Sequence, residues 1–200
     1  MKKVAIFTRI TNYNNKDILY IPKAIYNKIC NKVNVIIIPF EENDSYLDKL
    51  DLIKYVDGVI LPGGDDIYDF EIKLVKYLYK NDIPTLGICL GMQTMGCALN
   101  GKLEKLNNLK HKSKDLYVHN IKIDKNSLLY KILKKQLIKV NSRHQDYLLY
   151  TDLNVGAKCE NIIEEVEDTS KRFFVGVQWH PENLDDDNSS KLFNYFIKKL

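Results

Sequence analysis

The first hundred residues alternate short apolar runs with longer amphipathic stretches, and this alternation constrains the fold more than any other feature. Each apolar run has the length of a buried strand, and each amphipathic stretch has apolar residues at the spacing of one helix face. The expected strands lie at 3–7, 33–38, 58–61 and 84–88, and the expected helices at 18–31, 46–54, 70–80 and 90–99. Apolar strands that alternate with helices predict a parallel sheet covered on both faces.

From about Tyr117 onward, strands follow one another with few helices between them. The expected strands lie at 118–123, 137–140, 161–167 and 173–178, and a helix at 189–200 closes the chain. This arrangement predicts an antiparallel extension of the parallel sheet. Because no linker, repeat or low-complexity tract is present, we expect residues 1–200 to form one domain. Its expected fold is a three-layer α/β/α sandwich with a flavodoxin-like, mostly parallel central sheet.

The composition argues against several classes of protein. Lys and Arg exceed Asp and Glu by only 30 to 26, and the lysines are scattered, so no nucleic-acid partner is expected. No apolar run is long enough for a signal peptide or a membrane span, which predicts a cytoplasmic protein with no membrane partner. The four cysteines form no CxxC pair and the four histidines no HxxxH pair, so free thiols and no metal site are expected.

One cysteine stands between two glycines in Gly87-Ile88-Cys89-Leu90-Gly91, where an expected strand turns into an expected helix. Ligands collect beyond the carboxyl ends of the strands in open parallel sheets. A turn this tight needs small neighbours and lifts a nucleophile clear of its backbone, and the positive end of the helix at Leu90 favours a thiolate. The alternative is a buried cysteine beside a glycine-rich turn, which is our interpretation of Cys97, inside the expected helix.

A thiolate nucleophile needs a base and a group that holds the base. Both occur in Gln178-Trp179-His180-Pro181-Glu182, which follows an apolar strand. If this segment is extended, residues two apart point to the same side, so Glu182 could hold the ring of His180 and steady its charged form. The alternative is an ordinary helix start with proline in its first turn.

Amide cleavage also needs donors for the oxyanion. The backbone N–H of Leu90 follows the nucleophile and is available by position. A second donor is expected from Pro62-Gly63-Gly64-Asp65, which ends another strand of the same sheet. A plain Pro-Gly turn is the alternative for this stretch.

Together and in this order, these three stretches resemble the class I glutamine amidotransferase superfamily, from the first expected strand to the last expected helix. The resemblance implies that Cys89 forms a γ-glutamyl thioester, that His180 is the general acid and base, and that Glu182 orients it. It further implies an oxyanion hole made by the backbone N–H groups of Gly64 and Leu90.

The same resemblance implies a substrate-binding set. Gln93, in the family pattern Gly-x-Cys-x-Gly-x-Gln, is expected near the glutamyl group. The stretch Val140-Asn141-Ser142-Arg143-His144 is similar to the gamma-glutamyl hydrolase branch, typified by gamma-glutamyl-GABA hydrolase. That similarity implies that Ser142 and His144 border the pocket for the glutamate end. His119 and the Gly-Gly-x-Asp pattern at Gly63 also fit this branch.

Two departures leave the branch open. The branch usually carries arginine after the nucleophile, where this chain has Leu90, and a longer segment after the position of Asp66. The stretch 87–93 is also similar to glutaminase subunits such as that of imidazole glycerol phosphate synthase. We therefore expect a free-standing hydrolase that cleaves a small γ-glutamyl amide without cofactor. The alternative is a glutaminase subunit that acts on glutamine and delivers ammonia to a synthase partner.

Two further alternatives come from other classes of protein. One is a binding module that kept the fold and lost turnover, and the other is a redox sensor or chaperone with a cysteine at the same turn. The intact set Cys89, His180 and Glu182 argues against both. The sequence leaves open whether the chain forms a homodimer.

Overall fold

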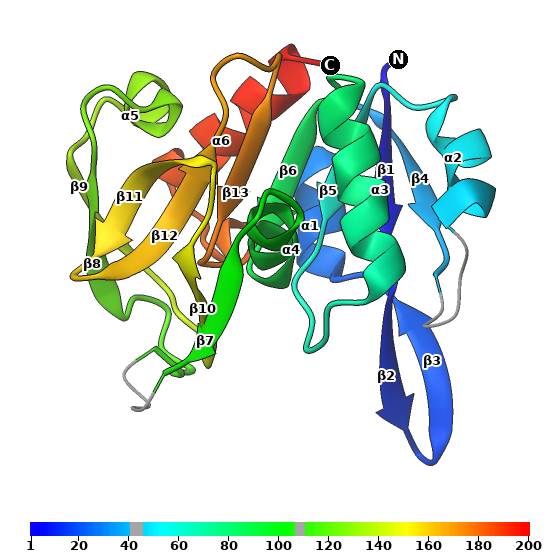
Figure 1. Ribbon diagram of the computed structural model, residues 1–200, viewed down its shortest axis with the longest axis horizontal. Coiled ribbons are helices and arrows are strands. Elements are labelled where there is room, and N and C mark those ends of the chain that lie inside the picture. The colour runs from blue at the N-terminus through cyan, green and yellow to red at the C-terminus, as the bar shows by residue number, and fades with distance from the viewer. Residues whose placement is uncertain (41–45, 107–110) are drawn as a thin grey trace.

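The computed structural model describes residues 1–40, 46–106 and 111–200. Within these ranges, a nine-stranded sheet has the order β4 (Asn34–Ile38), β1 (Lys3–Phe7), β5 (Gly58–Leu61), β6 (Thr85–Ile88), β13 (Phe174–Val177), β12 (Ile162–Glu167), β11 (Asn154–Cys159), β8 (His119–Ile123) and β9 (Leu137–Val140) (Figure 1). From β4 to β13 neighbouring strands are parallel, and from β13 to β9 they are antiparallel. The predicted parallel sheet and its antiparallel extension are therefore confirmed.

Helices cover both faces of the sheet, which confirms the three layers. Successive residues of a strand point to opposite faces. In β1, Val4 and Ile6 pack in the core with α1 (Lys23–Ile29) and α6 (Asp187–Lys198), whereas Ala5 and Phe7 pack in the core with α3 (Asp69–Lys80) and α4 (Leu90–Ala98). In Figure 1, α3 and α4 lie in front of the parallel strands and α1 and α6 behind them.

The expected helix at 18–31 is wrong in its first part. The structure has a hairpin of β2 (Arg9–Tyr13) and β3 (Lys16–Tyr20), and α1 begins only at Lys23, after Pro22. Asn14 and Asn15 both have positive φ, 52° and 60°, which is the backbone that a tight two-residue hairpin turn requires. The side chains of β3 are exposed, so their apolar spacing does not mark a core face. Figure 1 shows the β2–β3 hairpin projecting from the rest of the fold.

Several elements were not expected from the sequence. A second small sheet pairs β7 (Lys102–Lys105) with β10 (Asp146–Tyr150). Helix α5 (Leu128–Leu133) begins after Ser127, whose side chain accepts a hydrogen bond from the Tyr130 N–H. The remaining helix, α2 (Tyr46–Ile53), lies as predicted. No helix within the described ranges has the length and apolar character needed to cross a membrane.

Candidate active site

Cys89 lies at the junction of β6 and α4, where the two glycines predict a sharp turn. Its backbone has φ 52° and ψ −107°, a conformation that costs energy for any residue with a side chain. The Cys89 N–H donates to the Val177 carbonyl of the neighbouring strand at 2.8 Å, which fixes the turn to the sheet. A Cβ on Gly91 would lie 2.1 Å from the Leu61 carbonyl oxygen, so the first turn of α4 can approach β5 only with glycine there.

His180 and Glu182 form a close pair beside this turn. The His180 Nδ1 and Glu182 Oε1 atoms are 2.8 Å apart, and Glu182 is buried. The segment is not extended as expected: residues Pro181–Asn183 form a 3-10 turn, and the carboxylate reaches the ring from that turn. The two side chains are paired as predicted, but the backbone between them forms a 3-10 turn rather than an extended segment.

The electrostatic environment of His180 stabilises its charged form. Burial disfavours the imidazolium, but interactions with the Cys89 sulfur and the Glu182 carboxylate outweigh burial and raise the pKa of His180 to about 10. The ring therefore lies between a sulfur and a carboxylate that both favour its proton. A histidine in this position can hold a proton for a leaving group.

The turn after β5 packs directly against the cysteine and the histidine. A Cβ on Gly63 would lie 2.9 Å from His180 Cε1 and 3.4 Å from Cys89 Cβ. A Cβ on Gly64 would lie 3.0 Å from the Leu90 side chain. The two residues predicted to supply oxyanion N–H groups, Gly64 and Leu90, are therefore neighbours at the mouth of the turn.

Arg9 supports this turn and was missed as a site residue. Its guanidinium is buried, with Nη1 donating to Glu71 Oε1 at 2.6 Å and Nη2 donating to the Pro62 carbonyl at 2.8 Å. The side chain also lies against Gly64. The sequence signal for Arg9 was its position two residues after the apolar strand that ends at Phe7, because such a position lies at the carboxyl end of the sheet.

Asn141 holds the backbone of His180. Its Oδ1 accepts from the His180 N–H and its Nδ2 donates to the His180 carbonyl, both at 2.8 Å. The next residue, Ser142, was expected to bind substrate, but its buried hydroxyl donates to the His111 carbonyl at 2.6 Å. Ser142 does not line either pocket that adjoins Cys89 within the described ranges.

Two adjoining pockets meet at Cys89 and share Gly64, Asp65 and Arg143. The larger has a volume of about 370 Å³ and lies on the His180 side, where Tyr20 and Pro22 from the β3 end also line it. The smaller, of about 130 Å³, is lined further by Gln93, Lys112, His144, Gln145 and Asp146. Gln93 and His144, which were predicted to bind substrate, thus line a pocket beside the cysteine.

Gln93 and Gln178 form a buried chain that ends at the sulfur. Gln178 Nε2 donates toward Cys89 Sγ at 3.6 Å, and Gln93 Nε2 donates to Gln178 Oε1 at 3.1 Å. The same Gln93 nitrogen donates to the Asp146 carbonyl at 2.7 Å. Because the nitrogen is engaged, Gln93 has its amide oxygen left for a ligand.

The other three histidines converge, against the expectation from their sequence spacing. His111, His119 and His144 surround the carboxylate of Glu164, which is completely buried. Burial favours protonation of Glu164, but the facing histidines outweigh it and lower its pKa, while burial lowers the pKa of His144. This cluster is the part of the described chain in which nitrogen and oxygen donors could hold a metal ion.

Comparison with known proteins gives a family match and several relatives. The sequence model of the family "Glutamine amidotransferase class-I" matches residues 19–200. The glutamine amidotransferase-like protein RP404 of Rickettsia prowazekii is 29% identical over 74% of this chain and 78% of its own length. A CTP synthase of Porphyromonas gingivalis is 31% identical over 94% of this chain but only 41% of the synthase. The glutaminase domain of Trypanosoma brucei CTPS, solved with bound acivicin, has the same fold, with a TM-score of 0.72, 18% identity, and coverage of 100% of this chain and 94% of that one.

Proposed function

This chain belongs to the class-I glutamine amidotransferase family, and we propose that it hydrolyses the side-chain amide of glutamine through a γ-glutamyl thioester on Cys89. The observation that carries the proposal is the strained turn at Cys89 with the His180–Glu182 pair beside it. A cysteine, an acid–base histidine and a carboxylate that orients it are the groups that covalent amide cleavage requires.

The first half of the reaction releases ammonia. The Cys89 sulfur attacks the side-chain carbonyl carbon, a C–S bond forms, and the carbonyl electron pair moves to oxygen. The backbone N–H groups of Gly64 and Leu90 would hold that oxyanion. The electron pair on the oxyanion then re-forms the carbonyl, the C–N bond breaks, and His180 gives its proton to the departing nitrogen. Glu182 keeps the imidazole in place during both steps.

The second half regenerates the enzyme. A water molecule attacks the thioester carbonyl while His180, now neutral, accepts a proton from it. The tetrahedral species collapses, the C–S bond breaks, and the electron pair returns to the Cys89 sulfur. Glutamate leaves with both oxygens on its side-chain carbon.

The smaller pocket suits the amino-acid end of the substrate. Cationic Lys112 and Arg143 and anionic Asp65 and Asp146 line it together. A free α-amino acid carries one ammonium and one carboxylate, and opposite charges at close range are complementary to both. The oxygen of Gln93 adds an acceptor at the same pocket. Ser142 would act indirectly, by holding the loop that carries these residues.

The relatives favour glutamine as the substrate and a synthase as the partner. One is named CTP synthase, and this chain spans 41% of its length; others are named GMP synthase (glutamine-hydrolyzing), and the chain spans about a quarter of theirs. In this proposal the chain would supply ammonia to a separate synthase. The free-standing gamma-glutamyl hydrolase expected from the sequence thereby becomes the second candidate.

The larger pocket supports that second candidate. Its volume of about 370 Å³ lies on the His180 side, where the leaving nitrogen departs. Ammonia is about the size of water, which fills only about 30 Å³ of liquid. A substituted amine could occupy the remaining space, so hydrolysis of a small γ-glutamyl amide stays the alternative.

The test is a glutamate-release assay on the purified chain with glutamine and with a panel of γ-glutamyl amides. We expect glutamine hydrolysis that Cys89→Ser abolishes and Cys97→Ser leaves unchanged, because Cys97 lies away from the pockets. Faster turnover of a substituted amide would favour the second candidate. In parallel, a diazoketone analogue of glutamine should label Cys89, as read by mass spectrometry. Absence of both turnover and labelling would reject amide cleavage by this chain.

A further inference from the structure

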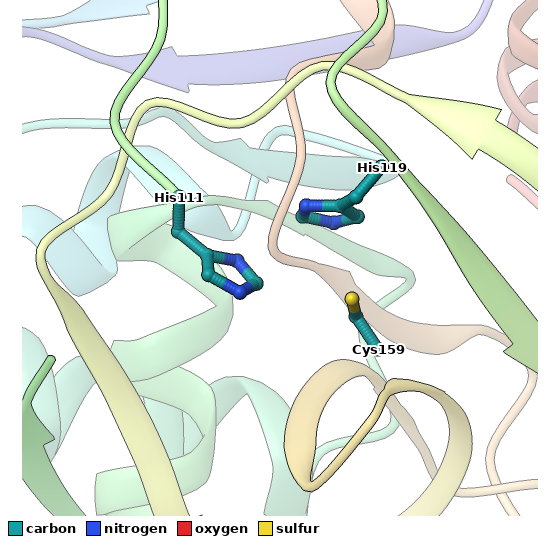
Figure 2. A group of neighbouring side chains, drawn as sticks. All are labelled: His111, His119 and Cys159. Atoms are coloured by element: carbon teal, nitrogen blue, oxygen red, sulfur yellow. The ribbon is translucent and has the colours of Figure 1, made fainter. Parts of the chain in front are cut away.

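Three of the four histidines of the chain surround one buried carboxylate and are separate residues from the His180–Glu182 pair. His119 lies on β8 and Glu164 on β12, two strands of the sheet that are separated by β11, while His111 and His144 lie in loops outside the strands. The distances from Glu164 Oε1 are 3.0 Å to His119 Nε2, 3.5 Å to His111 Nδ1 and 3.9 Å to His144 Nε2. Figure 2 shows the His111 and His119 rings facing one another.

The atoms that face one another in this cluster lack hydrogen-bond partners. Within the described part of the chain, both oxygens of Glu164, His111 Nδ1, His144 Nε2 and both ring nitrogens of His119 are buried and unpartnered. Although His119 Nε2 is close to the carboxylate, their relative orientation does not form a hydrogen bond. Burial of unpaired polar groups and of a carboxylate is costly. A cation among these atoms would offset that cost.

The tautomer of His144 adds a directional argument. Its Nδ1 is 2.9 Å from the Asp146 carbonyl oxygen. A carbonyl oxygen can only accept, so Nδ1 carries the hydrogen. In the neutral ring, Nε2 then has a lone pair, and that lone pair faces Glu164 Oε1. Two acceptors face each other, as they do around a metal ion whose histidine ligands are oriented by carbonyl groups.

We propose that His111, His119, His144 and Glu164 bind one divalent transition-metal ion of the Zn²⁺ type. Ligand atoms about 2.0 Å from a tetrahedral zinc lie about 3.3 Å from one another. The three distances to Glu164 Oε1, from 3.0 to 3.9 Å, bracket that separation. One donor atom from each of His111, His144 and Glu164 lies within 4.8 Å of the other two, and His119 Nε2 joins them through its 3.0 Å approach to Glu164 Oε1.

The donor set selects the class of metal. Three imidazoles and one carboxylate suit Zn²⁺ and its neighbours in the first transition series, whereas Ca²⁺ and Mg²⁺ prefer oxygen ligands. The Cys159 sulfur lies near His111 and His119 and points toward them (Figure 2). We assign Glu164 as the anionic ligand, because it is completely buried and unpartnered, whereas Cys159 is partly exposed.

Four protein ligands leave a tetrahedral ion with no open position, which is the arrangement of a structural site. The ion would fasten the loop at His111 to the sheet. That loop is joined to the next one by the His144 N–H and the Ser142 hydroxyl, which both donate to the His111 carbonyl. Asn141, which holds the catalytic His180, directly precedes Ser142. The inferred site would therefore stabilise the loop of Asn141 and Ser142, which positions the catalytic histidine.

The first experiment uses the unmodified chain and does not depend on activity. The protein is stripped with a chelator, titrated with Zn²⁺ alone, desalted and analysed for metal. We expect about one zinc per chain and a higher unfolding temperature. Substitution with Co²⁺ should give the intense visible absorption of a tetrahedral site without a thiolate charge-transfer band. A folded chain that retains no zinc, or a weak octahedral cobalt spectrum, would overturn the proposal and leave a cluster that holds only protons.

Variants identify the ligands. His119→Ala and Glu164→Gln are each expected to lower zinc affinity at least about 100-fold, since outer-sphere changes alone cost 10- to 100-fold. The matched control is His180→Ala, which removes the one histidine outside the cluster and should keep its zinc. Cys159→Ala should also keep it. Unchanged affinity in both ligand variants would overturn the assignment, and if they do not fold, the cobalt spectrum of the unmodified chain decides.

Discussion

The side-chain amide of Asn141 forms two hydrogen bonds with the backbone of His180, one to its N–H and one to its carbonyl. The two residues lie 39 positions apart, and Asn141 is completely buried. An amide that satisfies a donor and an acceptor of one residue fixes both the position and the orientation of that backbone. Asn141 is therefore a positioning residue for His180, the acid and base of the proposed reaction, although it does not line the pockets at Cys89.

Replacing Asn141 with alanine should reduce turnover more than substrate binding. The change leaves two buried backbone groups of His180 unpaired, which costs about 1–3 kcal/mol of stability, and lets the ring drift from its place. We expect kcat to fall about 10- to 100-fold with little change in KM. Steady-state kinetics and urea unfolding measure the two effects. Asn120→Ala, an exposed asparagine on β8, is the control, and an unchanged kcat for Asn141→Ala would contradict the positioning role.

Arg9→Met should destabilise the chain strongly. It leaves the buried Glu71 carboxylate without its charge partner and removes the donor to the Pro62 carbonyl, and breaking a buried ion pair costs about 3–5 kcal/mol. Urea unfolding measures this loss. The double variant Arg9→Met with Glu71→Gln should recover part of the stability, because it also removes the negative charge of Glu71 that has lost its partner. Arg172→Met breaks an exposed pair with Asp82 and two exposed guanidinium hydrogen bonds to the Asp82 carbonyl, and it should cost about 1 kcal/mol or less because water replaces these contacts. Equal losses for Arg9→Met and Arg172→Met would refute the prediction.

The His180–Glu182 pair should make stability depend on pH above neutrality. The folded-state pKa of His180 is raised to about 10 from an ordinary value of 6.5. A raised histidine pKa contributes stability that is complete below about 6.5 and is lost as pH rises toward about 10. Glu182→Gln removes one cause of the raised pKa. We expect the parent to exceed this variant in unfolding free energy most clearly near pH 6, with the gap closing by pH 10. A difference in unfolding free energy between the parent and Glu182→Gln that grows with rising pH would contradict the prediction.

Glu165→Gln should stabilise the protein at neutral and alkaline pH. Burial and the neighbouring Glu167 carboxylate raise the pKa of Glu165 well above its ordinary value. The unfolded chain releases this proton near pH 4.5, whereas the folded chain keeps it to a higher pH. The free energy of unfolding therefore falls as pH rises from about 4.5 to the raised pKa of the folded state. Glutamine has no proton to release. The expected result is a higher unfolding temperature at pH 8 that vanishes near pH 4. The exposed Glu160→Gln serves as control, and a lower unfolding temperature at pH 8 would count against the prediction.

Local patterns predicted what depends on local sequence. The strands at Lys3–Phe7 and Gly58–Leu61 were predicted with their bounds, because runs of apolar residues followed by turn residues specify a buried strand. The hairpin before α1 was not predicted, because the apolar residues of its exposed strand β3 have a spacing that also fits one face of a helix. The turn at Cys89 was predicted because glycines were needed where backbones approach closely.

Contacts between distant segments could not be predicted in this way. Asn141 binds the backbone of His180, which lies 39 residues further along the chain. A contact at that separation produces no recognisable spacing in the sequence. The histidine cluster joins residues from His111 to Glu164, and its assembly depends on the antiparallel pairing of β12, β11 and β8. The sequence spacing of the histidines therefore predicted no metal site, although three of them meet in space.

Gly63→Ala tests the packing of the turn after β5 against His180 and Cys89, without requiring a new backbone conformation. No described glycine has positive φ, so alanine can adopt the conformation of Gly63. Its Cβ, however, would lie 2.9 Å from His180 Cε1 and 3.4 Å from Cys89 Cβ. Relieving this contact requires a shift of the His180 ring or of the turn, which changes their relative placement, and a misplacement of about 1 Å costs about 100-fold in rate. We expect kcat/KM for glutamine to fall by about that factor while the urea midpoint changes little. Full activity in Gly63→Ala would mean that the turn does not border the reacting atoms.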